Sequence, residues 1–308
     1  MTASWPIDLE AAQRVANKLG LSGDVTPLAS NGMVNACYRV GLNMVLRLPL
    51  DEEAVECIHI EILASRAIEG QGLQTPRLLA AASEVGNGLP PYTLYEWVEG
   101  VRLSELDPNS VEAQQVVFEV GAEAAKLRRL GLVLPDLPRD VYRPPVNELK
   151  DLARQDLTGI DALRRKLDML AADAIATACP ERLIHNDLHP WNVIVRQDGS
   201  GLAGILDWGD ARTARPAAEF QAFPAQMLSH FFRGYLSQLW QDIPSSFYKE
   251  ALCHWICKAV WEAVALDEAI YERNWWAWPQ GGIQEFLGQV DSLEAHFGAM
   301  QSNAAQTG

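Results

Sequence analysis

The chain has 308 residues, of which 48% are hydrophobic, 21% charged and 8% aromatic. These proportions are typical of a globular protein, and they exclude a disordered chain, a collagen and a low-complexity scaffold. The formal net charge of -15 at pH 7 argues against a nucleic-acid partner, because neutralising phosphates requires a basic face. The length suffices for two domains or two lobes, each large enough to bury its own core.

Neither an export signal nor a membrane span is indicated. Residues 1–9 lack the basic and apolar regions of a signal peptide, and no run of about 18 apolar residues occurs. We therefore expect a cytoplasmic protein without a membrane partner. The five cysteines are scattered, as is typical of reduced thiols. Cys253, His254 and Cys257 share a helix face, but apolar residues surround them and no second ligand cluster completes a zinc site, which favours core packing.

The first hundred residues alternate between helix and strand signals. Periodicity and turn residues predict a helix, two strands, a helix and two strands, over residues 7–19, 37–40, 44–48, 53–69, 76–82 and 92–98. This order predicts a compact α+β unit that ends near residue 98.

Helical periodicity dominates beyond residue 100. Helices are predicted over residues 110–130, 149–178, 247–270 and 283–300. Proline makes 135–145 irregular. One segment breaks the helical pattern, because 182–210 reads as strand, loop, strand and loop. Functional residues are expected there, since loops held by a rigid scaffold carry much of protein chemistry.

Two short apolar strands, over 192–195 and 204–206, carry polar residues at their ends. Asp187 lies before the first strand, Asn192 lies at its first position, and Asp207 follows the second strand. Such residues are poor strand formers and are costly to bury without partners. Oxygen ligands suit Mg²⁺, so the segment predicts a magnesium site.

The same segment carries a recognisable motif. The pattern His-x-Asp-x-x-x-x-Asn, followed by a strand and Asp-aromatic-Gly, resembles the catalytic core of protein kinases. The run His-Asn-Asp-Leu-His-Pro-Trp-Asn at 185–192, with Ile-Leu-Asp-Trp at 205–208, resembles more closely the aminoglycoside phosphotransferase and choline-kinase-like family of small-molecule kinases. In that family the loop ends in Pro-Gly-Asn, and Trp or Phe follows the metal aspartate. The resemblance spans roughly 25–225 and weakens in the C-terminal helices.

This resemblance implies a fold as well as a reaction. The fold would be a bilobal, protein-kinase-like α+β architecture. A small β-rich nucleotide-binding lobe would occupy 1–98, and a larger helical lobe with the catalytic and acceptor-binding residues would occupy 99–308.

The resemblance also implies a role for each motif residue. Asp187 would accept or orient the substrate hydroxyl as general base, while His185 would brace the loop through hydrogen bonds. Asn192 and Asp207 would hold Mg²⁺ against the phosphates of ATP. Phosphoryl transfer needs mainly positioning and charge neutralisation, which these residue types supply.

The N-terminal unit offers the remaining nucleotide contacts. Asn31 lies in a turn placed to cover the phosphates, although the turn is poor in glycine. Arg47 interrupts an apolar strand where a protein kinase has lysine, and its guanidinium can bridge two phosphates. Glu61 is expected to pair with Arg47, with Glu56 as the alternative.

The strand that ends near residue 98 resembles the linker between kinase lobes. There the adenine edge would bond backbone groups of Glu96 and Val98, so that their side-chain identities matter little. ATP is the expected donor, with GTP as the alternative.

The acceptor is the least specified part of the site. Asp210 lies just beyond the metal aspartate, beside the transferred phosphoryl group, and is the candidate substrate contact. Acidic and tryptophan residues recur in the C-terminal helices and suit an amine-bearing acceptor through charge and cation–π contact. The alternative, favoured for most of them, is that the tryptophans fill the core while the acids face solvent. The net charge likewise fits either a cationic ligand or simple solubility.

Three functions compete on these residues. The first is an ATP-dependent kinase acting on a hydroxyl of an aminoglycoside or another antibiotic, as a resistance enzyme does, or of a metabolite such as an amino alcohol or sugar. The second is a catalytically weak kinase-like binding protein, suggested by Arg47 and the glycine-poor turn. A protein kinase ranks last, because Pro216 follows Asp207 too soon to leave room for a peptide-docking segment.

Overall fold

The computed structural model describes residues 7–28, 34–86, 88–139, 159–176, 179–239, 243–265, 279 and 281–306. The chain divides into two compact units. Unit 1 comprises Met1–Gly100 and Ala203–Ala211, and unit 2 comprises Val101–Leu202 and Arg212–Gly308. Each unit therefore contains part of the motif-bearing segment.

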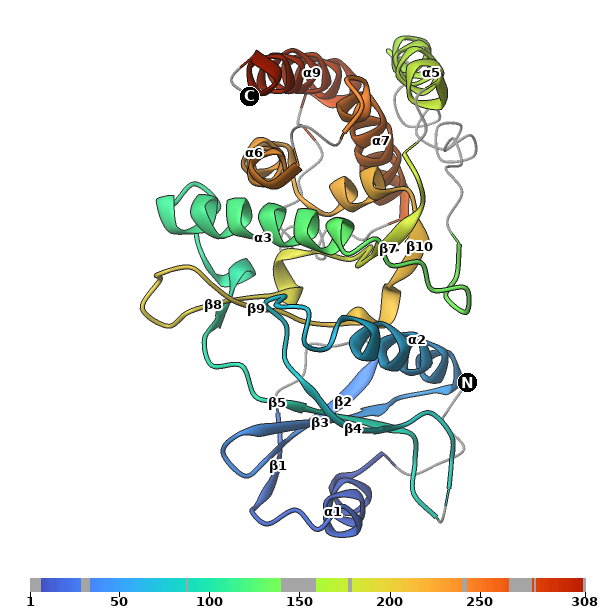
Figure 1. Ribbon diagram of the computed structural model, residues 1–308, viewed down its shortest axis with the longest axis vertical. Helices are drawn as coiled ribbons and strands as arrows, with labels where there is room; N and C mark the ends of the chain where they lie inside the picture. The colour runs from blue at the N-terminus through green and yellow to red at the C-terminus, as the bar shows by residue number, and fades with distance from the viewer. Residues whose placement is uncertain are drawn as a thin grey trace. The chain divides into compact units, whose positions relative to one another are not determined.

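Unit 1 is built on a five-stranded antiparallel sheet (Figure 1). In spatial order the strands are β1 (Val25–Pro27), β2 (Asn35–Val40), β3 (Met44–Pro49), β5 (Tyr92–Glu96) and β4 (Leu78–Ala82). Two helices accompany it, α1 (Leu9–Lys18) and α2 (Glu52–Ile68). The order of helices and strands matches that predicted from the sequence except for the short strand β1, which was not predicted.

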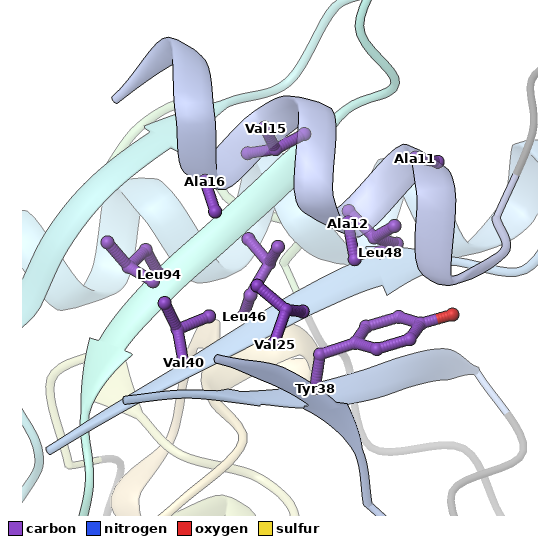
Figure 2. Packing of buried hydrophobic residues seen from close by; sticks show 10 residues of the cluster. All are labelled: Ala11, Ala12, Val15, Ala16, Val25, Tyr38, Val40, Leu46, Leu48 and Leu94. Atoms are coloured by element: carbon purple, nitrogen blue, oxygen red, sulfur yellow. The ribbon is translucent and has the colours of Figure 1, made fainter. Parts of the chain in front are cut away.

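Helix α1 covers one face of this sheet with small residues. It begins at Asp8, whose side chain accepts a hydrogen bond from the Ala11 N–H at 2.8 Å and so satisfies a donor of the first turn. Figure 2 shows α1 along the sheet, with Ala12 and Ala16 pointing toward the strands. The Tyr38 hydroxyl donates to the Ile7 carbonyl at 2.5 Å. The buried cluster comprises Ala11, Ala12, Val15, Ala16, Val25, Tyr38, Val40, Leu46, Leu48 and Leu94.

A late segment of the chain completes unit 1. Strand β9 (Leu202–Ile205) leads from unit 2 into unit 1, and the 3-10 helix η3 (Trp208–Asp210) follows it. The Ile205 N–H donates to the Gln74 carbonyl at 2.8 Å. Helix η3 packs against α2. Unit 1 therefore holds Asp207 by contacts with residues more than a hundred positions earlier.

Unit 2 is mainly helical (Figure 1). Its helices are α3 (Val111–Arg129), α5 (Ile160–Ala176), α6 (Ala225–Leu239), α7 (Phe247–Ala265) and α9 (Gly282–Gln306). Its short 3-10 helices are η1 (Leu103–Glu105), η2 (Pro190–Asn192) and η4 (Pro216–Ala222). Two antiparallel strand pairs lie among them, β6 (Val101–Arg102) with β8 (Val193–Val195), and β7 (Arg182–Ile184) with β10 (Arg212–Ala214).

Helices α3 and α6 cross closely, side by side in Figure 1. Glycine makes the approach possible, because a Cβ on Gly121 would overlap the carbonyl oxygen of Phe231, and one on Gly234 that of Phe118. An aromatic cluster lies alongside, in which Phe220 meets four other rings edge-on at centroid distances of 4.9–5.6 Å. These rings form the core that supports the motif-bearing loop of unit 2.

The predicted helices of the C-terminal half correspond to α3, α7, α9 and the described part of α5, while 149–158 lie outside the described residues. Helix α6 and the short strands β6 and β10 were not predicted. Among the described residues, no helix is long and apolar enough to cross a membrane.

Candidate active site

Arg47 is the centre of the charged cluster in unit 1. It lies on β3 between Leu46 and Leu48, both fully buried against α1, and the two-residue period of a strand directs it to the opposite face. There one guanidinium nitrogen donates to the carboxylate of Glu61, and the other donates to Oδ1 of Asp207 at 3.0 Å. The expected pair of Arg47 and Glu61 is thus present, and the alternative, Glu56, is exposed.

The cluster is mostly shielded from water. The Glu61 side chain is 2% exposed and that of Arg47 13%, whereas Asp207 is 42% exposed. Burial raises the pKa of Glu61 to about 7, and the Arg47 guanidinium opposes that shift. Burial also disfavours the Arg47 charge, but Asp207 and Glu61 outweigh it and raise the pKa of Arg47 above its ordinary value. The Arg47 guanidinium therefore pairs with both Glu61 and Asp207. Asp207, the more exposed of the two acids, is the candidate metal ligand.

Strand β5 ends in the segment that was predicted to contact adenine. The Glu96 N–H donates to the Arg77 carbonyl at 3.1 Å, and the Trp97 N–H donates to the Asn43 carbonyl at 2.8 Å. These two donors are therefore engaged within unit 1. The contacts of Glu96 and Val98 with an adenine edge stay a prediction.

The second half of the motif lies in unit 2, directly after β7. His185 is completely buried, and its Nδ1 accepts the Asp187 N–H at 3.2 Å. The Asn192 side-chain nitrogen donates to the Asp187 carbonyl at 3.0 Å and to Oδ2 of Asp187 at 2.7 Å. His185 and Asn192 thus hold the loop around Asp187.

Two motif residues have an unusual backbone. Asn186, with φ 69°, and Asp207, with φ 65°, are the non-glycine residues with positive φ in the described part of the chain. Asn and Asp adopt this left-handed conformation more readily than most residues, yet it still has a conformational cost. Both positions lie inside the motif, where such strain is commonly associated with function.

Helix η4 supplies a support that the sequence analysis missed. Glu219 is 2% exposed and accepts the backbone N–H groups of His185 at 2.5 Å and Asn186 at 3.1 Å. Gln221 donates to the carbonyl and the side-chain oxygen of Asn186 at 3.1 and 2.8 Å. Burial raises the pKa of Glu219 to about 7, and the two backbone hydrogen bonds oppose that shift. A lone acid within the small, apolar run Pro-Ala-Ala-Glu-Phe was the signal that could have revealed it.

The other predicted residues are placed as follows. Asp210 is exposed in η3 of unit 1, near Cys57 of α2. Asn31 lies outside the described residues, as do the tryptophans at 275, 276 and 278. Trp255 is 1% exposed and donates its indole N–H to the Phe223 carbonyl at 3.0 Å, as expected for a tryptophan that fills the core. Trp261 is instead 43% exposed and Glu262 is buried, contrary to that expectation.

The two residues predicted to bind a metal are both oxygen donors, which hard divalent cations prefer. Asp207 offers a carboxylate in unit 1, and Asn192 offers an amide oxygen in unit 2. Among the described residues, no three His, Cys, Asp or Glu side chains form a group able to hold a metal by themselves. This pattern fits Mg²⁺, which is typically bound by one or two protein groups and completed by nucleotide phosphates and water.

Comparison with known proteins places the chain in a family. Residues 24–266 match the family model described as the phosphotransferase enzyme family. The chain belongs to this family. The predicted small-molecule phosphotransferase is thereby confirmed as an enzyme class. A search of the curated proteins finds no match.

Solved structures of phosphotransferases share the fold. The GDP complex of aminoglycoside 2'-phosphotransferase-IIIa is 16% identical with a TM-score of 0.59, covering 93% of this chain and 98% of that chain. Macrolide 2'-phosphotransferase type I is 16% identical with a TM-score of 0.57, and the match covers 89% of this chain and 98% of that chain. A choline/ethanolamine kinase family protein from Mesorhizobium loti is 16% identical with a TM-score of 0.55, and the match covers 97% of this chain and 100% of that chain. The predicted protein-kinase-like α+β fold is confirmed.

Proposed function

We propose that this phosphotransferase moves the γ-phosphoryl group of ATP to a hydroxyl group of a small molecule in a Mg²⁺-dependent reaction. The observation that carries the proposal is the arrangement of Asp187, whose carboxylate and backbone are fixed by Asn192 and His185. A carboxylate held in this way is suited to orient a hydroxyl and accept its proton.

The remaining roles follow from the chemistry of the residues. Arg47 contacts the nucleotide phosphates, and Glu61 fixes the orientation of its guanidinium. Asn192 and Asp207 supply oxygen ligands to Mg²⁺, which neutralises charge on the phosphates. The Glu96 carbonyl and the Val98 N–H bind the adenine edge. GTP is the alternative donor, and structures related in fold are described with GDP, ADP and ATP.

The acceptor that we propose is cationic, such as an aminoglycoside. The net charge of -15 and the exposed carboxylate of Asp210 support this choice. Proteins with the same fold are described in complexes with kanamycin and gentamicin. A neutral acceptor, such as a sugar or an alcohol, is the alternative outcome of the test.

The test is a panel of hydroxyl acceptors incubated with ATP or GTP, with and without Mg²⁺, and assayed for nucleoside diphosphate release and for the phosphorylated product. We expect Asp187→Asn and Asp207→Asn each to reduce kcat by at least about a hundredfold, because positioning and proton transfer are lost. Asp198→Asn changes an exposed aspartate in the turn after β8 and is the matched control.

Each outcome separates the competing functions. Product formation that requires Mg²⁺ and Asp187 supports the kinase. Tight nucleotide binding without product from any acceptor would instead indicate a kinase-like binding protein. Near wild-type turnover by Asp187→Asn would show that the role assigned to this residue is wrong.

A further inference from the structure

Thr75 touches both flanks of Asp207. It lies between α2 and β4, and its hydroxyl donates to the Ile205 carbonyl at 3.0 Å. The same oxygen accepts the indole N–H of Trp208 at 3.0 Å. Residues 205 and 208 enclose Asp207, so one hydroxyl group links the strand before this aspartate to the ring that follows it.

Other contacts fix the same short segment. The Ile205 N–H is bound by the Gln74 carbonyl, next to Thr75, and Trp208 is 4% exposed. Gly209 lies close to α2, since a Cβ added to it would be 3.2 Å from Cβ of Cys57 and 3.4 Å from Oδ1 of Asp207. The residues around Asp207 are therefore constrained on both sides, and all of these contacts lie within unit 1.

The constraint bears on a residue whose backbone is strained. Asp207 has φ 65° and ψ 73°, and a non-glycine residue keeps this conformation only where its surroundings impose it. A relaxed backbone would direct the carboxylate elsewhere. Ile205 and Trp208 are anchored to the same hydroxyl, so Thr75 opposes that relaxation more directly than a contact with one flank would.

We infer that Thr75 is a positioning residue that holds Asp207 in its metal-binding orientation. This inference rests on the proposed role of Asp207 as a ligand to Mg²⁺. Groups outside the ligand set that orient a ligand commonly alter metal affinity by about 10- to 100-fold when they are removed. Thr75 itself is not proposed to touch the metal or the substrate.

The test measures metal binding directly, with Mn²⁺ as the probe. The dissociation constant of Mn²⁺ in the presence of saturating ADP is determined by electron paramagnetic resonance, independently of turnover. We expect Thr75→Val, which removes the hydroxyl but keeps a similar shape, to raise this constant about tenfold. Thr75→Ser retains the hydroxyl and should stay near wild type. ADP affinity in EDTA should be unchanged in both variants.

Thr213→Val is the matched control for lost hydrogen bonds. The Thr213 hydroxyl also donates and accepts once, to the Leu134 carbonyl at 2.9 Å and from its N–H at 3.2 Å, but in unit 2. We expect it to lower the unfolding midpoint without changing Mn²⁺ affinity. Trp208→Phe removes the other partner of the Thr75 hydroxyl and tests the inference if Thr75→Val fails to fold.

The outcomes distinguish this inference from the proposed function. Wild-type Mn²⁺ affinity in Thr75→Val or, where that variant fails to fold, in Trp208→Phe would overturn the role of Thr75 while leaving the kinase proposal intact. Asp207→Asn provides the reference, since it should weaken Mn²⁺ binding further than either. If Asp207→Asn binds Mn²⁺ as wild type does, the metal assignment fails and the inference fails with it.

Discussion

At the scale of single residues, the charge of Arg47 stabilises a buried carboxylate and, in the proposed function, also contacts the nucleotide phosphates. Its guanidinium neutralises Glu61, a carboxylate that is 2% exposed, and also holds Asp207. Removing Arg47 alone would leave a buried charge without its partner, which typically costs about 3–5 kcal/mol of unfolding free energy. A simple alanine variant would thus confuse lost binding with lost stability.

A double variant separates the two effects. We expect Arg47→Met with Glu61→Gln to fold, because both charges are removed, and to bind MgATP more weakly by about 1.5–3 kcal/mol, as for lost hydrogen bonds to a charged group. Isothermal titration calorimetry with a non-hydrolysable ATP analogue measures this difference. Arg14→Met, which removes an exposed pair on α1, is the control. Equal affinity of the double variant and wild type would refute the phosphate contact.

Some supporting residues were predicted from the sequence and others were missed. The two groups differ in how far along the chain their hydrogen-bond or ion-pair partners lie. Glu61 was found because a helix follows β3 directly and places an acid within reach of Arg47. Glu219 and Thr75 were missed because their partners are distant in the chain, at 185–186 and at 205 and 208. A motif indicates which residues react. It carries little information about the side chains that position them.

At the scale of secondary structure, local periodicity predicted most elements and packing decided the rest. Helix α6 was missed although Met227, Phe231 and Tyr235 recur at helical spacing. Gly234 in its interior lowers the helix propensity. That glycine is what allows α6 to approach α3. Strand β10 has three residues and pairs with β7, which is distant in the chain. Neither contact is visible in a local window of sequence.

The glycine contact leads to a prediction about stability. We expect Gly234→Ala to lower the free energy of unfolding by about 1–3 kcal/mol, because the added methyl group overlaps the Phe118 carbonyl and forces α3 and α6 apart. Urea denaturation followed by circular dichroism measures the change. Gly288→Ala in α9 is the control, since no atom lies within 4 Å of its added Cβ and alanine favours a helix. Similar midpoints for Gly234→Ala and wild type would contradict the steric argument.

At the scale of the whole molecule, the chain order does not follow the compact units. Residues 203–211 return to unit 1 after a hundred residues of unit 2. The predicted boundary near residue 98 rests on local composition, which indicates where strand-rich and helix-rich regions change. Composition does not indicate that a later segment packs on an earlier unit. The motif was nevertheless recognisable, because it consists of two short runs of sequence, at 185–192 and 205–208, that can be read without knowing the path of the chain.

The net charge of the molecule leads to a prediction about the acceptor. If the acceptor is cationic and the charge of -15 attracts it, its KM should rise as salt increases from about 0.1 M to about 1 M, because the Debye length falls from about 10 Å to about 3 Å. MgATP must be saturating at each salt concentration. Asp210→Asn should raise KM about two- to fivefold at low salt, as for an exposed ion pair, and should flatten the salt dependence. Asp24→Asn makes the same change of charge at an exposed site near β1 and is the control. A best acceptor that is neutral, or a KM independent of salt, would mean that the acidic composition favours solubility and does not select the substrate.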